Sequence, residues 1–196
     1  NGQTYYIATK EITMTYAPIA LFTYNRADHT QRAVESLLKN AEAKYSDLFI
    51  FSDGPKTPEK KAGVEENRKY IHTISGFKSI SIIEREKNWG LANSLIAGIT
   101  EVINKYGKVI VVEDDLILSP YFLQFMNEGL EKYKDDDRVG TITGFVPPIK
   151  DKLPETFFLK YFQCWGWATW KRAWDLLETD ARPLLKGLRF KKTKFD

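Results

Sequence analysis

The stretch from Lys108 to Ser119 constrains the fold of this chain more than any other. It reads Lys-Val-Ile-Val-Val-Glu-Asp-Asp-Leu-Ile-Leu-Ser. The unbroken run Val109–Val112 is typical of a strand that is buried on both faces of a parallel sheet. Three carboxylates, Glu113, Asp114 and Asp115, follow this run directly. Ligands of open α/β sheets bind beyond the carboxyl ends of the strands, so we expect the acidic triplet to lie at a functional site.

Three adjacent negative charges repel one another, and a buried site tolerates them only beside a cation or hydrogen-bond donors. A hard divalent ion that carries a nucleotide diphosphate meets this need. Such an ion takes one or two protein carboxylates, and phosphate oxygens and waters complete its shell. The alternative is a solvated acidic turn between a strand and a helix. The apolar strand before the triplet favours the functional site.

Strands and helices alternate along the chain as far as Gly144. We expect helix starts at an Asp28–Gln31 capping box and where prolines follow Thr57 and Ser119. Strands are expected over 18–23, 48–51, 79–84, 109–112, 139–143 and 157–162, and further helices over 91–106 and around Trp174. The pattern predicts an α/β fold with a mainly parallel central sheet and helices on both faces.

The length of 196 residues suits one domain, which we expect over 16–196 after an N-terminal extension, 1–15, outside the fold. We expect this domain to be cut short at its C-terminal end. A net charge of +3 argues against nucleic acid as a partner. The single cysteine, Cys164, and the lack of an apolar span predict a cytoplasmic protein. Basic and apolar residues interleave over 186–194, which indicates either peripheral contact with an anionic membrane or a solvated helix.

Four segments taken together resemble the GT-A glycosyltransferases, most closely the N-acetylglucosaminyltransferase I type and its bacterial relatives. They are Pro18–Arg26, Ser52–Pro55, Val111–Leu116 and the Trp-Gly-Trp segment at 165–167. The resemblance implies a GT-A fold, a UDP-sugar donor such as UDP-N-acetylglucosamine, and inverting transfer to a glycan or another hydroxyl acceptor. It also implies a divalent metal, manganese rather than magnesium.

By this resemblance, Thr23 and Arg26 line the uridine pocket, and Asp53 accepts a hydrogen bond from uracil N3. The role of Asp53 is chemically sound, because a carboxylate accepts from the imide N–H of uracil and cytosine has no proton there. The alternatives are a surface arginine at a helix start and an aspartate that forms a turn.

The same resemblance gives Asp115 to the metal, and Asp114 and Glu113 to the ribose and the donor sugar. Asn88 opens a helix whose N-terminus is expected to face the same crevice. Because helix N-termini favour anions, this helix would assist in binding the diphosphate.

Trp165 and Trp167 flank a glycine that lets the backbone approach a ligand closely. Each indole suits the C–H face of a sugar ring, and core packing is the alternative for each. The general base of the family follows its Gly-Trp segment, and no residue here matches it. Either the base lies beyond residue 196 or an acid nearby replaces it, and the catalytic residue is therefore unassigned. The nearby acids are Asp175, Glu178 and Asp180.

Two other functions stay open. A nucleotidyltransferase also joins acidic strand ends to a metal and a nucleotide, but it needs a glycine-rich basic loop after the first strand, and 24–27 contains no glycine. A non-catalytic nucleotide-sugar-binding fragment would need no general base.

Overall fold

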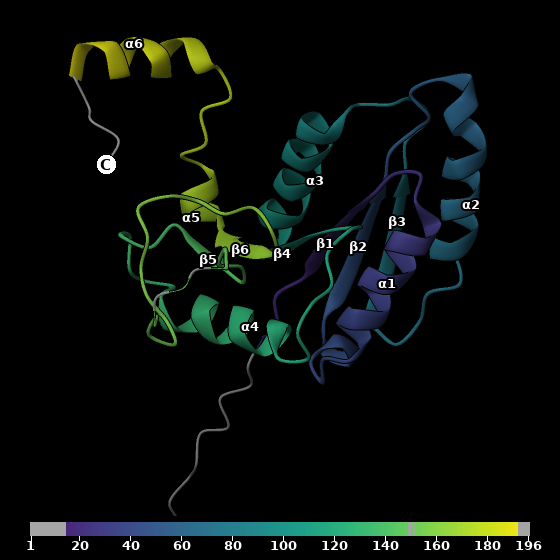
Figure 1. Ribbon diagram of the computed structural model, residues 1–196, viewed down its shortest axis with the longest axis horizontal. Coiled ribbons are helices and arrows are strands. Elements are labelled where there is room, and N and C mark those ends of the chain that lie inside the picture. Colours follow the sequence, from purple (N-terminus) through teal and green to yellow (C-terminus); the bar gives the residue numbers. More distant parts are fainter. Residues whose placement is uncertain (1–14, 149, 151, 192–196) are drawn as a thin grey trace, which may run out of the picture.

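The computed structural model describes residues 15–148, 150 and 152–191. Its centre is a six-stranded sheet with the strand order β3-β2-β1-β4-β6-β5 (Figure 1). The strands are β1 Ile19–Thr23, β2 Asp47–Ser52, β3 Ser79–Glu84, β4 Lys108–Glu113, β5 Thr141–Thr143 and β6 Trp167–Trp170. Strands β1 to β4 pair in parallel, whereas β6 runs antiparallel to β4 and β5. The predicted extension, 1–15, lies outside the described residues except for its last member.

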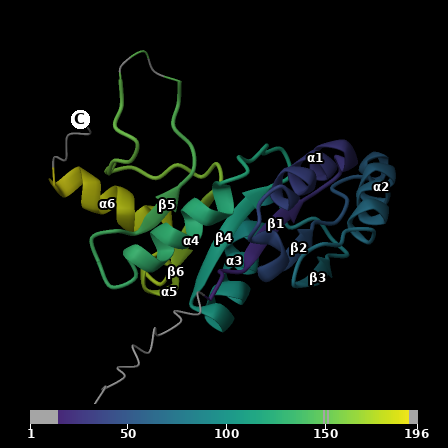
Figure 2. The ribbon, with the colours of Figure 1, turned by 90° about the horizontal axis from the view of Figure 1, so that it is seen from below.

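Helices cover both faces of this sheet, as Figures 1 and 2 show. The helices are α1 Ala27–Leu38, α2 Lys61–Ile71, α3 Leu91–Tyr106, α4 Phe122–Lys132, α5 Lys171–Trp174 and α6 Ala181–Lys191, with short 3-10 turns at Ala43–Tyr45 and Pro58–Lys60. Alternate residues of β1 enter two cores: Ile19 packs with α1, α2 and α4, and Phe22 packs with α3. Gly98 of α3 permits this close approach, since a Cβ there would lie 2.7 Å from the Phe22 ring. The predicted α/β fold is confirmed.

The predicted capping box of α1 is wrong, whereas Thr57 is the predicted N-cap residue, with Pro58 at the start of its helical turn. Helix α1 begins at Ala27, and in the described chain its N-cap residue, Arg26, makes no side-chain cap bond. Gln31 does not complete a capping box, because its Nε2 donates to Glu35 one turn later, at 2.7 Å. The helix expected from residue 57 to 74 is a 3-10 turn followed by α2, which ends at Ile71.

The segment after β5 also differs from the prediction. Residues 157–162 form no strand in the described structure, and Phe158 is 68% exposed. The additional strand is instead β6, Trp167–Trp170, whose four residues are all buried. It pairs with β4 from Lys108↔Trp170 to Val111↔Trp167. An apolar run becomes a strand where it finds a partner edge, and the partner here is β4.

Candidate functional site

Parallel pairing brings the ends of β1, β2, β3 and β4 to one edge of the sheet. Thr23 is paired with Ser52, which precedes Asp53, and Phe22 is paired with Glu113. Because β6 is antiparallel, its start also reaches this edge, through the pair Val111↔Trp167. The structure therefore brings the predicted residues of four separate segments together.

An arginine joins the acidic triplet to the end of β1. Arg26 Nη2 donates to Asp114 Oδ1 at 2.5 Å and to Asp115 Oδ2 at 3.1 Å. The side chain of Asp114 is 6% exposed, whereas that of Asp115 is 47% exposed. The second oxygen of Asp114, Oδ2, is buried and finds no hydrogen-bond partner among the described residues. A buried acceptor in this state is costly, and a ligand that supplied a proton or a cation would satisfy it.

The charges of the triplet are incompletely compensated. Burial raises the pKa of Glu113, and the charges of Asp115 and Asp114 raise it further against the opposing charge of Arg26. Burial also raises the pKa of Asp114, and together with the charge of Asp115 it outweighs the hydrogen bond and charge of Arg26 and the backbone N–H of Tyr24, which lower this pKa. The charged forms of Glu113 and Asp114 are thus disfavoured by their surroundings, and a further cation would favour them.

The oxygen ligands at this edge fit a metal that is shared with a phosphate. In the part of the chain that the structure describes, no three His, Cys, Asp or Glu side chains gather into a metal-binding group. Asp115, whose side chain is 47% exposed, offers a carboxylate to such an ion, whereas Asp114 Oδ2 is buried beside it in the chain. Hard divalent ions are commonly held by one or two carboxylates, and diphosphate oxygens and waters supply the remaining ligands.

Asp53 is hydrogen-bonded to the backbone of the loop that precedes α3. Its Oδ1 accepts from the N–H groups of Gly54 and Trp89, at 3.0 and 2.9 Å. Its Oδ2 accepts from those of Trp89 and Gly90, at 3.2 and 3.0 Å. The sequence analysis missed this role, although a helix start just after residue 90 was a signal for a capping carboxylate. Asp53 therefore ties β2 to α3, and its predicted contact with uracil stays a prediction.

The same loop holds two further side chains in place. Asn88 Nδ2 donates to the carbonyl of Gly54 at 2.8 Å, so this residue binds the neighbouring loop. Arg85 is only 8% exposed, donates to the hydroxyl of Ser94 and stacks on the indole of Trp89 at 4.1 Å. Burial lowers the pKa of Arg85, against the charges of Asp53 and Glu101. Sequence reasoning missed Arg85, because a charged residue in a polar loop has no local signal of burial.

Thr23 meets α2 rather than open solvent. Its hydroxyl accepts a hydrogen bond from Asn67 Nδ2 at 3.0 Å, and both residues are buried. Among the described residues, Asn67 Oδ1 has no hydrogen-bond partner. Sequence reasoning also missed Asn67, which looked like one more polar residue of a polar helix.

The two predicted tryptophans have different surroundings. Trp167 is buried, with its ring 4.7 Å from that of Phe162 and 6.2 Å from that of Trp174. Trp165 is 51% exposed and packs edge-on against Phe145 at 4.6 Å. The core-packing alternative therefore describes Trp167, whereas the indole of Trp165 is half exposed and its predicted contact with a sugar stays a prediction.

The three nearby acids are all bonded to neighbours. Asp175 accepts from Lys171 Nζ at 2.6 and 2.9 Å, and Glu178 Oε1 accepts from the backbone of Asp180 at 2.8 Å. Asp180 pairs with both Nε and Nη2 of Arg182. These bonds favour none of the three as a general base, and the catalytic residue stays unassigned.

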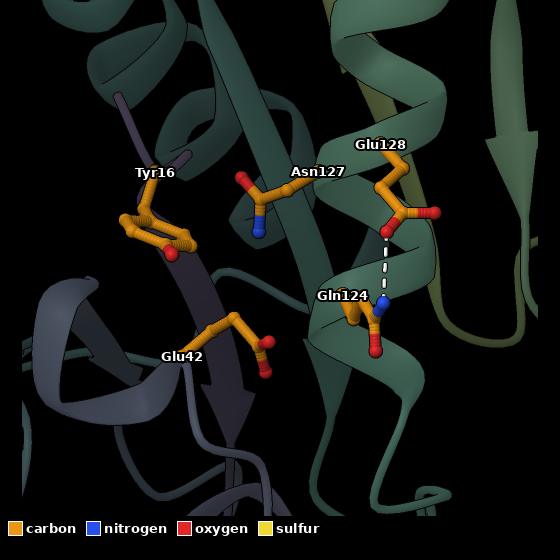
Figure 3. A pocket seen from close by; sticks show the side chains of 5 residues that line it. All are labelled: Tyr16, Glu42, Gln124, Asn127 and Glu128. Atoms are coloured by element: carbon orange, nitrogen blue, oxygen red, sulfur yellow. Dashed lines mark hydrogen bonds between the residues drawn. The ribbon is translucent and has the colours of Figure 1, made fainter. Parts of the chain in front are cut away.

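A cavity of about 290 Å³ lies elsewhere in the molecule (Figure 3). Its lining residues are Tyr16, Glu42, Gln124, Asn127 and Glu128. Tyr16 precedes β1, so the cavity lies toward the amino ends of the strands, away from the acidic triplet. Gln124 donates to Glu128, and Asn127 accepts from the backbone of Ala17. These groups serve packing between α4 and the start of β1.

Helix α6 contains the first part of the predicted basic segment, 186–194, whereas 192–194 lie outside the described residues. It stands apart from the sheet in Figure 1, with Leu184 and Leu185 half exposed. No helix within the described ranges has the length and apolar character of a membrane span.

Comparison with known protein families shows which family this chain belongs to. The family described as "Glycosyl transferase family 2" matches residues 19–186, which is most of the chain. The chain belongs to glycosyl transferase family 2. The match begins at β1 and includes the acidic triplet and β6 of this family 2 domain. The closer resemblance to the N-acetylglucosaminyltransferase I type stays a proposal. No curated protein matches the chain.

Three solved structures are distantly similar to this chain. A mannosyltransferase from Pyrobaculum calidifontis, in complex with GDP-Man and Mn2+, shares 14% identity over 65% of this chain, with a TM-score of 0.43. TarS of S. aureus shares 15% sequence identity over 60% of this chain, with a TM-score of 0.42. The 4-diphosphocytidyl-2C-methyl-D-erythritol synthase of Anaerococcus prevotii shares 8% over 92% of this chain and 86% of its own, with a TM-score of 0.46. This chain spans 35% of the mannosyltransferase and 20% of TarS.

Proposed function

We propose that this domain is a metal-dependent, inverting glycosyltransferase that takes its sugar from a UDP-sugar, with UDP-N-acetylglucosamine as the first donor to test. The acceptor would be a hydroxyl group of a glycan or of another molecule. The observation that carries the proposal is the group of Arg26, Asp114 and Asp115, in which a buried carboxylate oxygen has no hydrogen-bond partner among the described residues. A diphosphate and a divalent ion supply the charges that this group needs.

Separate residues of the chain would bind the metal, the diphosphate and the donor sugar. Asp115 would hold the divalent metal, Mn2+ in preference to Mg2+, which when bound neutralises charge on the departing UDP, and Asp114 would face the ribose. Arg26 precedes the first turn of α1, so its guanidinium and the helix N-terminus both favour an anion there. Glu113, whose pKa burial raises, would face the donor sugar.

Residues of the neighbouring strands would hold the rest of the donor. Asp53 and Thr23 would bind the uridine, and both are already fixed by hydrogen bonds to other elements. Asn88 would act through the loop that it ties to Gly54. Trp165, half exposed at the same edge, would pack on a sugar ring.

Two further parts of the proposal concern the surroundings of the protein. The single exposed cysteine, Cys164, supports a reducing, cytoplasmic setting. The half-exposed Leu184 and Leu185 support peripheral contact of α6 and the basic segment 186–194 with an anionic membrane surface.

Titration calorimetry of the protein with UDP, with and without Mn2+, tests the proposal. We expect UDP to bind with Mn2+ and to bind weakly or not at all without it. Lack of UDP binding under both conditions would refute the proposal.

A second assay separates the three candidate functions. Release of UDP from a UDP-sugar supports a transferase, and release of pyrophosphate from CTP and a sugar phosphate would indicate a nucleotidyltransferase. UDP binding without either reaction, even with a panel of acceptors, would indicate a binding fragment.

A further inference from the structure

The indole of Trp89 has one covered face and one open face. The guanidinium carbon of Arg85 lies 4.1 Å from the centre of the Trp89 ring, so a planar cation covers one face. Trp89 is nevertheless 49% exposed. Since Arg85 shields one face of the ring, the exposed area lies on the other face and the edges. A stacking surface for a second planar group is therefore available.

Hydrogen bonds hold the backbone of Trp89 and the guanidinium that covers its ring. The backbone N–H of Trp89 donates to both carboxylate oxygens of Asp53, at 2.9 and 3.2 Å. Arg85, which supports the covered face, is itself fixed by hydrogen bonds to the hydroxyl and carbonyl of Ser94. The Trp89 carbonyl accepts from Asn93 Nδ2 at 2.9 Å. A ring fixed in advance loses little conformational freedom when a ligand stacks on it.

The backbone beside the ring leaves room for a ligand. Gly90 has φ +76°, and a Cβ built on it would meet no atom of the described chain within 4 Å. Residues with a side chain rarely adopt this conformation, so glycine both permits the turn and keeps the space open. Gly90 is also tied to Asp53, whose Oδ2 accepts from its N–H at 3.0 Å.

We propose that Trp89 is a base-stacking residue that helps to select the nucleotide: its open face packs on the pyrimidine ring whose edge Asp53 reads. This inference rests on the proposed function, since it requires a nucleotide at Asp53. A flat ring that donates to Asp53 lies one hydrogen bond from the residue that carries the indole. The ring of the base and the indole then stack, while the diphosphate extends toward Arg26 and the acidic triplet.

The competing role of Trp89 is purely structural: the indole would only shield Arg85 from water. The two roles differ in what Trp89→Ala does to ligands with and without a base. A stacking role affects UDP but not pyrophosphate, because only UDP carries a ring. A structural role disturbs the loop and so affects both ligands, or neither.

Titration calorimetry with UDP and with pyrophosphate, both with Mn2+, on the parent, Trp89→Phe and Trp89→Ala distinguishes the roles. We expect Trp89→Ala to weaken UDP by about 5- to 150-fold, which corresponds to about 1–3 kcal/mol for stacking of one base. Pyrophosphate should bind all three proteins equally, and Trp89→Phe should retain most of the affinity for UDP. Tyr45→Ala, which removes another aromatic side chain that is 49% exposed, is the matched control and should not weaken UDP.

Indole fluorescence gives an independent measurement that does not require the alanine variant to fold. UDP should quench the fluorescence of the parent, and Trp89→Phe should lose this quenching while it still binds UDP. Equal affinity of the parent and Trp89→Ala for UDP, equal losses for UDP and pyrophosphate, or unchanged quenching in Trp89→Phe would overturn the inference. If the parent itself binds no UDP, the proposed function fails first and the inference fails with it.

Discussion

Carboxylates stand at the ends of both β2 and β4, and their hydrogen bonding differs sharply. Both oxygens of Asp53 accept from backbone N–H groups, which come from Gly54, Trp89 and Gly90. Asp114 shares one oxygen with Arg26, and its other oxygen is buried without a partner among the described residues. The difference teaches that one carboxylate is built into the fold, whereas the other is held in a state that a bound cation or donor improves.

The largest expected effect is the loss of the β4 site. Asp115→Ala should weaken Mn2+-dependent UDP binding by at least about 100-fold, because changes even in residues that support metal ligands cost about 10- to 100-fold. The urea midpoint should stay unchanged, since the Asp115 side chain is 47% exposed. Asp135→Ala, which removes another exposed aspartate, is the control. Unchanged UDP affinity in calorimetry would show that the metal assignment is wrong.

The second prediction tests whether Asp53, at the end of β2, distinguishes uracil from cytosine. UDP should bind the unmodified protein more tightly than CDP by about 1.5–3 kcal/mol, or roughly one to two orders of magnitude, because cytosine lacks the N3 proton. The comparison uses the parent protein, since any change of Asp53 also disturbs the backbone that it binds. Equal affinities for the two nucleotides in competition titrations would dismiss Asp53 as the reader.

A third test compares the two carboxylates in folding. Asp53→Asn should lower the free energy of unfolding by about 1–3 kcal/mol, because the amide group turns a donor toward the N–H groups of Trp89 and Gly90. Asp115→Asn, the matched change at β4, should leave that free energy nearly unchanged. Urea denaturation measures both. Equal losses of unfolding free energy in the two variants would contradict the different structural roles of Asp53 and Asp115.

The smallest effect concerns pH. The pKa of Asp114 and that of Glu113 are raised in the folded protein above the ordinary values of 3.8 and 4.5. The folded protein therefore binds more protons than the unfolded chain just above these values, so these groups lower stability as pH rises through this window. Asp114→Asn should therefore gain stability relative to the parent as the pH rises above the ordinary value of 3.8. A constant difference across that range, measured by urea denaturation, would contradict the raised pKa of Asp114.

The central sheet could be predicted because its signal is local and repeated. The run Val109–Val112 is buried on both faces, so every residue is apolar, and the strand–helix alternation orders its neighbours. Strand β6 was missed because four residues that include two tryptophans resemble a ligand platform as much as a strand. The expected strand at 157–162 was wrong because an apolar run shows no sign of whether a partner edge is available.

In the candidate site too, the features with a local sequence signal could be predicted and those that depend on packing could not. The gathering of Asp53 and the acidic triplet at one edge could be predicted, since each follows a parallel strand. The hydrogen bonds from Trp89 and Gly90 to Asp53 depend on the packing of two loops 36 residues or more apart. The burial of Arg85 depends on the same packing. Contacts of this kind leave no pattern in a single sequence.

The reversed direction of β6 has one more consequence, for how this domain can vary. Strands β5 and β6 pair antiparallel, and the amide of Gly144 donates to the carbonyl of Gly166 at 2.8 Å, which closes the base of the segment between them. The length of that segment is therefore independent of the register of the sheet. We expect changes of length within 146–157, before the residues that contact the fold, to leave β4 and its carboxylates in place. The reversal thus separates the length of this segment from the register of the strands that carry the candidate site.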